Sequence, residues 1–325
     1  MKPNINKNLL KLILLAAAVL ISSITLVLFA PLNRTKYIAA VADKHQILEN
    51  TPGPRIIFIG GSNIAFGLDS RQVKEKLGYN VVNMGLHANL GIKYMVNEIK
   101  PQIKAGDIIV IIPEAPMVLQ GNKILLEISL YYSGAAGYLG LPEFFIMAQE
   151  FPQTFQRRLK GYLKFMLLEA GKEPKKWLPT DVYHRLSFNK FGDVTAHLRF
   201  AGKPFKRKRI FVYNKKWQEN QGAKTVAFLN RFHQYVTAKK ASLYFGFCPR
   251  PESLYKPHKQ RGETLYNWLK KDLSMPLLGK PTDFVFPDQW FYDSINHLNK
   301  KGRRIRTFIV IRELKKAGVK SLISK

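Results

Sequence analysis

The chain has 325 residues, of which 46% are hydrophobic, so it can bury a sizeable core and is not an intrinsically disordered chain. Its formal net charge of +30 makes polyanions the natural partners, whether nucleic acid, anionic lipid, teichoic acid or an acidic polysaccharide. The single cysteine, Cys248, excludes an intramolecular disulfide, a thiolate zinc cluster and a CxxC redox motif. We predict neither a metal nor a cofactor.

Residues 12–31 form an uncharged apolar run, LILLAAAVLISSITLVLFAP. A helix of this length, rising about 1.5 Å per residue, crosses a hydrocarbon core of roughly 30 Å. Lysines precede the run, and the positive-inside rule therefore favours a cytoplasmic N-terminus, although cations also follow it closely. We expect residues 1–34 to be a single-pass anchor in the cell membrane, with the rest of the chain in the periplasm.

Two other interpretations of this run stay open. A signal peptide cut after Ala30 would leave Pro31 directly beyond the cleavage site, which is unfavourable, and the run is long for the apolar region of a signal. A buried helix of a soluble fold is the third interpretation.

The first predicted strand is RIIFI at residues 55–59, after a linker and short helix over residues 32–54. Two glycines, Gly60 and Gly61, follow this strand and allow the chain to turn sharply. The turn presents Ser62 at an exposed corner.

The next elements continue an alternation of helices and strands. In order, they are a helix from Asp69 to about Leu77, a strand at 79–84 (YNVVNM), a helix at 89–103 and a strand at 108–112 (IIVII). Such near-continuous apolar strands are typical of a parallel sheet covered on both faces, so the predicted fold class is α/β. Active sites in these sheets lie at the carboxyl ends of the strands, where Ser62, Gly85 and Glu114 all stand.

The alternation breaks down over about 115–235, a stretch rich in aromatic and basic residues. We interpret it as a partly helical insertion in one domain that spans residues 35–325. Its basic clusters are Arg157-Arg158, Lys175-Lys176 and Lys206–Arg209. They fit either a solvated face or a surface for an anionic polymer or lipid headgroups.

The sheet pattern resumes with a helix near residues 222–238 and a strand at 241–248. A final helix is predicted over 299–316, with Asn299 as its cap. The side chains expected on or near its inner face are Ile305, Phe308, Ile309 and Ile311.

A serine hydroxyl is a weak nucleophile unless a base lies beside it and a third group orients that base. Among the histidines, His297 stands out because Asp293 precedes it by four residues, just before the final helix. If this stretch is a helical turn, the two side chains share one face. We predict that Asp293 orients His297, which takes the proton of Ser62.

These features together resemble the SGNH/GDSL hydrolase superfamily: a strand, Gly-Gly-Ser and a helix near the start, a glycine after the second strand, and an Asp–His pair before the last helix. The resemblance covers residues 55–114 and 241–316. It implies a three-layer, flavodoxin-like parallel sheet, and serine-dependent hydrolysis or acyl transfer by Ser62, Asp293 and His297.

In that superfamily the serine, a glycine amide and an asparagine form the oxyanion hole, and Gly85 matches the glycine. The sequence departs from the pattern where a GxND block is expected, because it reads Pro113-Glu114-Ala115. Asn89 or the backbone of Asn63 are the candidate substitutes. Losing one oxyanion donor typically costs on the order of 10²–10³ in rate, so a weak enzyme or a non-catalytic protein stays open.

Two smaller departures concern Gly61, which replaces the aspartate of the GDS motif, and the spacing DxxxH in place of DxxH. Three residues keep two interpretations each. Gly85 is an oxyanion donor or a turn glycine, Glu114 a site residue or a paired carboxylate, and His87 a substrate contact or a surface residue.

With its N-terminal anchor, the chain most resembles the subgroup that O-acylates cell-envelope polymers, which includes the D-alanyl transfer protein of teichoic acid and the alginate O-acetylation proteins. This implies an anionic envelope polymer or polysaccharide as acceptor, contact with inner-membrane lipid, and a membrane-bound O-acyltransferase as partner. A non-catalytic partner that binds polymer through the basic insertion is the alternative. Nucleic acid is not predicted, because no nucleic-acid motif accompanies the charge.

Overall fold

The protein is described here from a computed structural model. It describes residues 7–30, 32–115, 117–169, 172, 178, 181–202 and 214–323. The basic clusters at Lys175-Lys176 and Lys206–Arg209 lie outside these residues.

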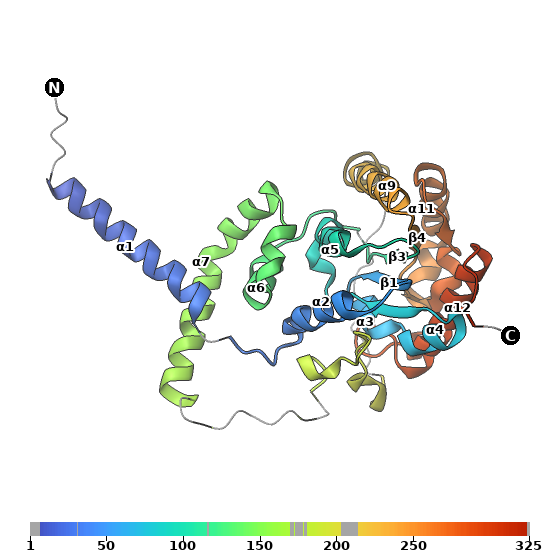
Figure 1. Cartoon of the computed structure of the whole chain (residues 1–325), viewed down its shortest axis with the longest axis horizontal. Helices are drawn as coiled ribbons and strands as arrows, with labels where there is room; N and C mark the ends of the chain where they lie inside the picture. The colour runs from blue at the N-terminus through green and yellow to red at the C-terminus, as the bar shows by residue number, and fades with distance from the viewer. Residues whose placement is uncertain are drawn as a thin grey trace.

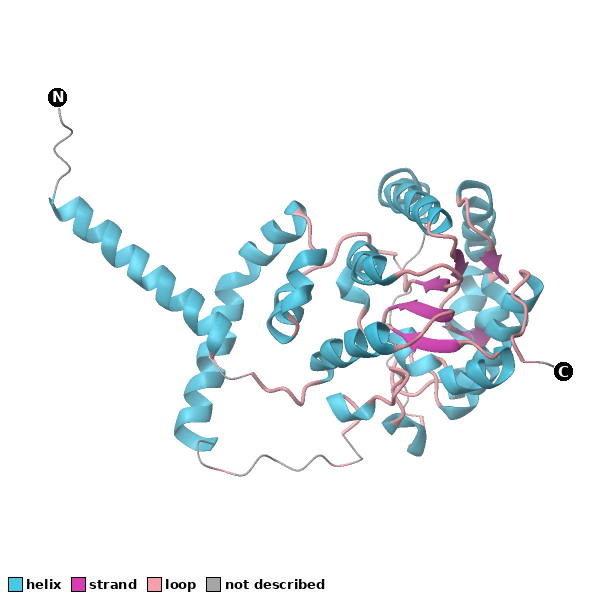
Figure 2. Ribbon diagram, in the orientation of Figure 1, coloured by secondary structure: helices cyan, strands magenta, loops and turns pink. Residues whose placement is uncertain are grey.

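Five parallel strands form the central sheet in the order β2-β1-β3-β4-β6 (Figure 2). They are β1 (Arg55–Gly60), β2 (Asn80–Asn83), β3 (Ile108–Ile112), β4 (Ser242–Gly246) and β6 (Leu277–Leu278). Every residue of β1 and β3 is buried, as their unbroken apolar sequences require for strands covered on both faces. The predicted α/β class with a parallel sheet is confirmed. A small parallel pair, β5 (Arg250–Pro251) and β7 (Val285–Phe286), lies apart from this sheet.

Helices cover both faces of the sheet. On one face α5 (Gly91–Ile99) packs beside α9 (Ala223–Ala238), and on the other α4 (Ser70–Leu77) packs beside α12 (Lys300–Lys316) (Figure 1). The predicted caps are confirmed. Asp69 accepts a hydrogen bond from the Gln72 N–H at the start of α4, and Asn299 accepts from the first turn of α12.

The buried face of α12 differs from the prediction. Of the four side chains expected on its inner face, Ile311 is buried and Ile309 half-buried, whereas Ile305 and Phe308 are exposed. The inner face instead carries Arg303 and Arg306, both buried and hydrogen-bonded to acceptors on neighbouring elements. Hydrophobicity alone misplaces this face because a buried guanidinium with enough acceptors is tolerated.

The remaining helices are α2 (Ala40–Asn50), α3 (Ser62–Gly67), α6 (Ile124–Tyr131), α7 (Leu141–Lys164), α8 (Lys215–Trp217), α10 (Glu252–Tyr255) and α11 (Lys259–Asp272). The helices α6, α7 and α8 belong to the predicted insertion. Its last part is α9, which packs against β4 and so belongs to the helical layer of the sheet.

The N-terminal helix α1 (Lys7–Phe29) projects away from the sheet and meets α7 near its own C-terminal end (Figure 1). Only Val27 of α1 is buried. The helix is long and apolar enough to be a membrane span or a signal anchor.

Candidate active site

Ser62 lies at the N-terminus of α3, where the chain turns after β1. A Cβ added at Gly60 would come within 2.5 Å of the Ile112 carbonyl oxygen. One added at Gly61 would come within 2.6 Å of a Glu114 carboxylate oxygen. The two glycines are needed because neighbouring groups approach too closely for a side chain. This close packing leaves Ser62 half-buried at the carboxyl edge of the sheet.

The imidazole of His297 lies against the serine hydroxyl. Its Nε2 is 2.9 Å from Ser62 Oγ, and its Nδ1 is 2.8 Å from Asp293 Oδ1. The His297 side chain is 9% exposed, and its ring stacks on Phe66, with centroids 4.0 Å apart and an angle of 8° between the planes. The structure therefore brings the three predicted residues together in the order that a serine nucleophile requires.

Asp293 and His297 do not share a helical turn, and this part of the prediction is wrong. The segment is a loop, closed by an antiparallel bridge between Phe291 and Leu298. Within it, the Tyr292 N–H donates to the His297 carbonyl oxygen at 2.8 Å. The loop folds back on itself and so brings residues i and i+4 together as a helix would, which makes the DxxxH spacing workable.

A tyrosine that the sequence analysis did not single out joins this relay. Tyr183 Oη donates to Asp293 Oδ2 at 2.6 Å and is 3.3 Å from His297 Nδ1. Burial raises the pKa of Asp293, but hydrogen bonds from His297 and Tyr183 outweigh it, and the pKa is lowered. Burial, and then the bond to Asp293, raise the pKa of the Tyr183 phenol. Near neutral pH, Asp293 is therefore ionised and Tyr183 keeps its proton.

A buried carboxylate holds the segment that carries Tyr183 to the rest of the site. Asp193 is fully buried and accepts from Arg303 Nη2 at 2.9 Å. It also accepts from Ser70 Oγ at 2.5 Å and from Asn83 Nδ2 at 2.7 Å. These bonds join the insertion to α12, α4 and β2. No local pattern in the sequence predicts such contacts, which explains why Tyr183 was missed.

Glu114 occupies the other side of Ser62. Its Oε1 accepts from the Asn63 N–H at 2.8 Å and lies 3.2 Å from Ser62 Oγ. Its Oε2 accepts from Asn296 Nδ2 at 2.9 Å. A hydroxyl has one proton, so Ser62 donates either to His297 or to Glu114. A carboxylate acceptor thus lies where donors to an oxyanion are expected.

The predicted oxyanion donor Gly85 makes no hydrogen bond to Ser62 among the contacts of the described residues. Its N–H donates to Asn83 Oδ1 at 2.9 Å, a bond that would have to break before the amide could serve an oxyanion. A Cβ at this position would come within 2.5 Å of Ile64 Cβ, so a glycine is needed for the packing of β2 against α3.

Asn89, the other candidate donor, is exposed, and its N–H donates to His87 Nδ1 at 3.1 Å. Among the described residues, Asn89 makes no hydrogen bond to Ser62. His87 is half-buried, and burial lowers the pKa of its imidazole more than the charge of Glu114 raises it. His87 is therefore near the site, and a role in contacting substrate stays a prediction.

The side chain of Asn63 is buried, and both its backbone N–H and its amide Nδ2 donate to Glu114 Oε1, at 2.8 and 3.4 Å. Arg306 donates to the Asn63 carbonyl oxygen at 2.6 Å and to its Oδ1 at 2.7 Å. Asn63 Nδ2 donates to the Ile112 carbonyl oxygen at 3.1 Å. Burial lowers the pKa of Arg306 to about 10, so the guanidinium stays charged at neutral pH. These bonds fix the first turn of α3, and with it the position of Ser62.

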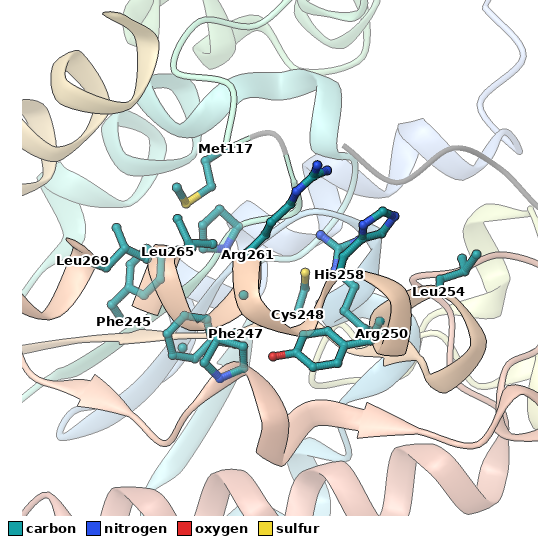
Figure 3. Close-up of a pocket in the computed structure, with 15 residues that line it drawn as sticks. Met117, Phe245, Phe247, Cys248, Arg250, Leu254, His258, Arg261, Leu265 and Leu269 are labelled. Carbon is teal, nitrogen blue, oxygen red and sulfur yellow. The ribbon is translucent and has the colours of Figure 1, made fainter. Parts of the chain in front are cut away.

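A cavity of about 80 Å³ lies at the carboxyl ends of β3 and β4. One wall is Pro113, which directly precedes Glu114 in the sequence, whereas Ser62, Glu114 and His297 are not among the lining residues. Figure 3 shows Leu265 on the apolar side and Arg261 pointing away from it. The hydroxyl of Tyr255, another lining residue, is buried without a hydrogen-bond partner in the described part of the chain. The apolar lining consists of Met117, Phe245, Phe247, Leu254, Leu265 and Leu269.

Among the described residues, no group of three or more His, Cys, Asp or Glu side chains could hold a metal ion. No protein-family model matches the sequence, and no curated protein matches it either. The function is therefore inferred from the geometry of the site.

Proposed function

We propose that this protein is a membrane-anchored serine esterase or O-acyltransferase of the SGNH type, which works through an acyl-Ser62 intermediate. The observation that carries the proposal is the relay from Ser62 through His297 to Asp293, with contacts of 2.9 and 2.8 Å. The position of Ser62 after the first strand of a five-stranded parallel sheet also supports it.

In the proposed reaction, His297 Nε2 takes the proton of Ser62 while Oγ attacks the acyl carbonyl carbon. The carbonyl π electrons move to oxygen and form a tetrahedral oxyanion. Asp293, which is ionised, stabilises the resulting imidazolium. His297 then gives its proton to the leaving alcohol, and the C–O bond to that alcohol breaks, which leaves the acyl group on Ser62.

The second half of the reaction repeats these steps with a new nucleophile. His297 takes a proton from water or from a sugar hydroxyl, whose oxygen attacks the acyl-serine, and then returns the proton to Ser62 Oγ. Water makes the protein an esterase, and a polymer hydroxyl makes it a transferase. The apolar cavity beside Pro113 is a suitable place for the acyl group during both halves.

The oxyanion requires donors, and the proposed backbone donor is the Asn63 N–H, which is bonded to Glu114. In the proposed mechanism the entering carbonyl oxygen displaces the carboxylate from this N–H. Asn296 Nδ2, which also donates to Glu114, would be released by the same movement and become a second donor.

The location and substrate follow from the anchor and the charge. If α1 crosses the membrane with its N-terminus in the cytoplasm, the sheet domain lies in the periplasm. A chain of net charge +30 then attracts an anionic envelope polymer or polysaccharide as acyl acceptor. A membrane-bound O-acyltransferase is the proposed source of acyl groups.

Hydrolysis of p-nitrophenyl acetate by the purified full-length protein tests the proposal. Wild type should release p-nitrophenol with a burst, because acylation precedes slower deacylation. Ser62→Ala should show neither the burst nor turnover. Ser129→Ala is a matched control, since Ser129 lies in α6 and bonds only to its own helix. Equal hydrolysis by wild type and Ser62→Ala would refute a serine enzyme.

The position of Glu114 favours one alternative, a non-catalytic protein of the same fold that binds polymer beside an acyltransferase. A carboxylate close to Ser62 Oγ and bonded to the Asn63 N–H opposes a developing negative charge. Complementation of a deletion strain separates the two functions. Full rescue by Ser62→Ala at normal protein levels would favour the non-catalytic protein, and failed rescue would favour the enzyme.

A further inference from the structure

The helix α7 has an apolar face that the described part of the protein leaves largely uncovered. Apolar side chains recur every three or four residues along it, which places them on one face of the helix. Leu141 is 76% exposed and Phe145 is 70% exposed, so this face is not a core surface. The stripe consists of Leu141, Phe145, Ala148, Pro152, Phe155, Leu159, Leu163 and Met166.

The opposite face of α7 is turned toward the body, where Met147 packs against a buried apolar cluster. Glu143 is buried and bonded to Lys93 Nζ of α5 at 3.0 Å. Thr154, on the same face, is also buried and accepts from Arg157 Nη2 of its own helix at 3.1 Å. The orientation of α7 is therefore fixed by this inner face, through the Glu143–Lys93 ion pair and the packing of Met147, and the apolar stripe points outward.

The neighbour of α7 is α1. Arg158 donates a hydrogen bond to the Ala30 carbonyl oxygen, directly beyond the last turn of α1. Figure 1 shows α7 lying across the end of α1, between that helix and the sheet. If α1 crosses a bilayer, the end that touches α7 lies at the membrane surface, and so does α7.

The composition of α7 suits that position. Interfacial helices combine an apolar face containing Phe and Leu with Lys and Arg on the polar side, which contact anionic headgroups. The second half of α7 carries Arg157, Arg158, Lys160 and Lys164. The π-helical turn that follows, Phe165–Glu169, continues the apolar exposure, since Leu167 is 78% exposed.

We propose that α7 lies in the plane of an anionic membrane surface, with its apolar stripe inserted at the boundary between headgroups and acyl chains. The inference rests on α1 crossing the bilayer and does not require Ser62 to be catalytic. The two helices together attach the protein at two places. Attachment by α1 alone would let the sheet domain rotate about its linker. A second contact along α7 fixes the orientation of the Ser62 site relative to the membrane.

The test uses full-length protein reconstituted into vesicles of equimolar phosphatidylcholine and phosphatidylglycerol. Single cysteines are placed in a Cys248→Ser background and labelled with a nitrobenzoxadiazole fluorophore. Phe145→Cys and Leu163→Cys probe the stripe, and Gln153→Cys is the matched control, because Gln153 is exposed but off the stripe. Far-UV circular dichroism checks that each variant is folded.

Labels at positions 145 and 163 should show blue-shifted emission and strong quenching by lipids with a nitroxide on the acyl chain. The label at 153 should keep the emission of a fluorophore in water. Water-like emission at all three positions would overturn the proposal. The proposal would also be overturned if the labels were shielded from water in native membranes but not in these vesicles. Cross-linking from position 145 in native membranes would then identify a protein, in place of lipid, as the partner of the stripe.

Discussion

The two sides of Ser62 are built differently. On one side, His297 and Asp293 form a continuous relay supported by Tyr183 and by the stacked ring of Phe66. On the other side, Glu114 places a carboxylate where a serine enzyme needs hydrogen-bond donors. The groups that move a proton, His297 and Asp293, are therefore already in place, whereas stabilisation of an oxyanion requires Glu114 to move.

The largest expected effect comes from the relay side. His297→Ala removes the only imidazole in contact with Ser62 Oγ among the described residues, and should lower the rate of ester hydrolysis by about 10³-fold or more. Steady-state kinetics with an activated acyl ester measure it. His233→Ala serves as control, since His233 bonds to Ser274 at the surface. Equal losses in both variants would show that His297 has no special role.

The next effect concerns Arg306, whose hydrogen bonds hold Asn63 in place. Arg306→Met leaves the buried Asn63 carbonyl oxygen and Oδ1 without their donor, which should cost about 2–3 kcal/mol in the free energy of unfolding. Urea denaturation monitored by circular dichroism measures this loss. Arg304→Met on the exposed face of α12 should change stability little. A similar cost for the two variants would contradict the structural role given to Arg306.

A smaller effect tests Glu114, the carboxylate beside Ser62. Glu114→Gln keeps an oxygen for the Asn63 N–H and offers an amide donor near Ser62, so it should raise the acylation rate by about tenfold. Pre-steady-state release of the leaving alcohol measures acylation. Glu263→Gln, an exposed change on α11, is the control. A rate that falls would show that the carboxylate assists catalysis.

The smallest effect concerns Tyr183. The folded pKa of Asp293 lies below the ordinary value of 3.8, so its ionised form contributes stability above that pH, which is lost as pH falls through the folded pKa. Tyr183→Phe removes one stabilising bond and should move the pKa of Asp293 upward. The stability that Asp293 contributes is then smaller, and its loss is complete at a higher pH. Carbon-13 NMR titration of the carboxyl group measures the shift, and an unchanged pKa would contradict it.

The parallel sheet, its strands β1 to β4 and the caps at Asp69 and Asn299 were predictable because each depends on a local pattern: an apolar run, a glycine turn or a side chain that accepts from nearby N–H groups. The two-residue strand β6 was not predicted, because it is too short to leave such a pattern. The pairing of Asp293 with His297 was also predicted, although through a helical turn that the structure replaces with a loop.

Other features depended on contacts between distant parts of the chain. Tyr183 reaches Asp293 from a segment 110 residues away, and Glu114 meets Ser62 across two strand ends. The polar inner face of α12 depends on acceptors supplied by other elements, so hydrophobic periodicity placed Phe308 on the wrong side. Local sequence carries little information on such pairings.

The central claim, that Ser62 carries an acyl group, is tested most directly by peptide mass spectrometry after brief incubation of the full-length protein with an activated acyl ester and acid quenching. The account predicts an acyl adduct on Ser62 in wild type and its absence in Ser62→Ala. The adduct should also be greatly reduced in His297→Ala, which keeps the serine but lacks the base. No adduct on Ser62 in the folded wild-type protein, together with wild-type turnover by Ser62→Ala, would contradict the account.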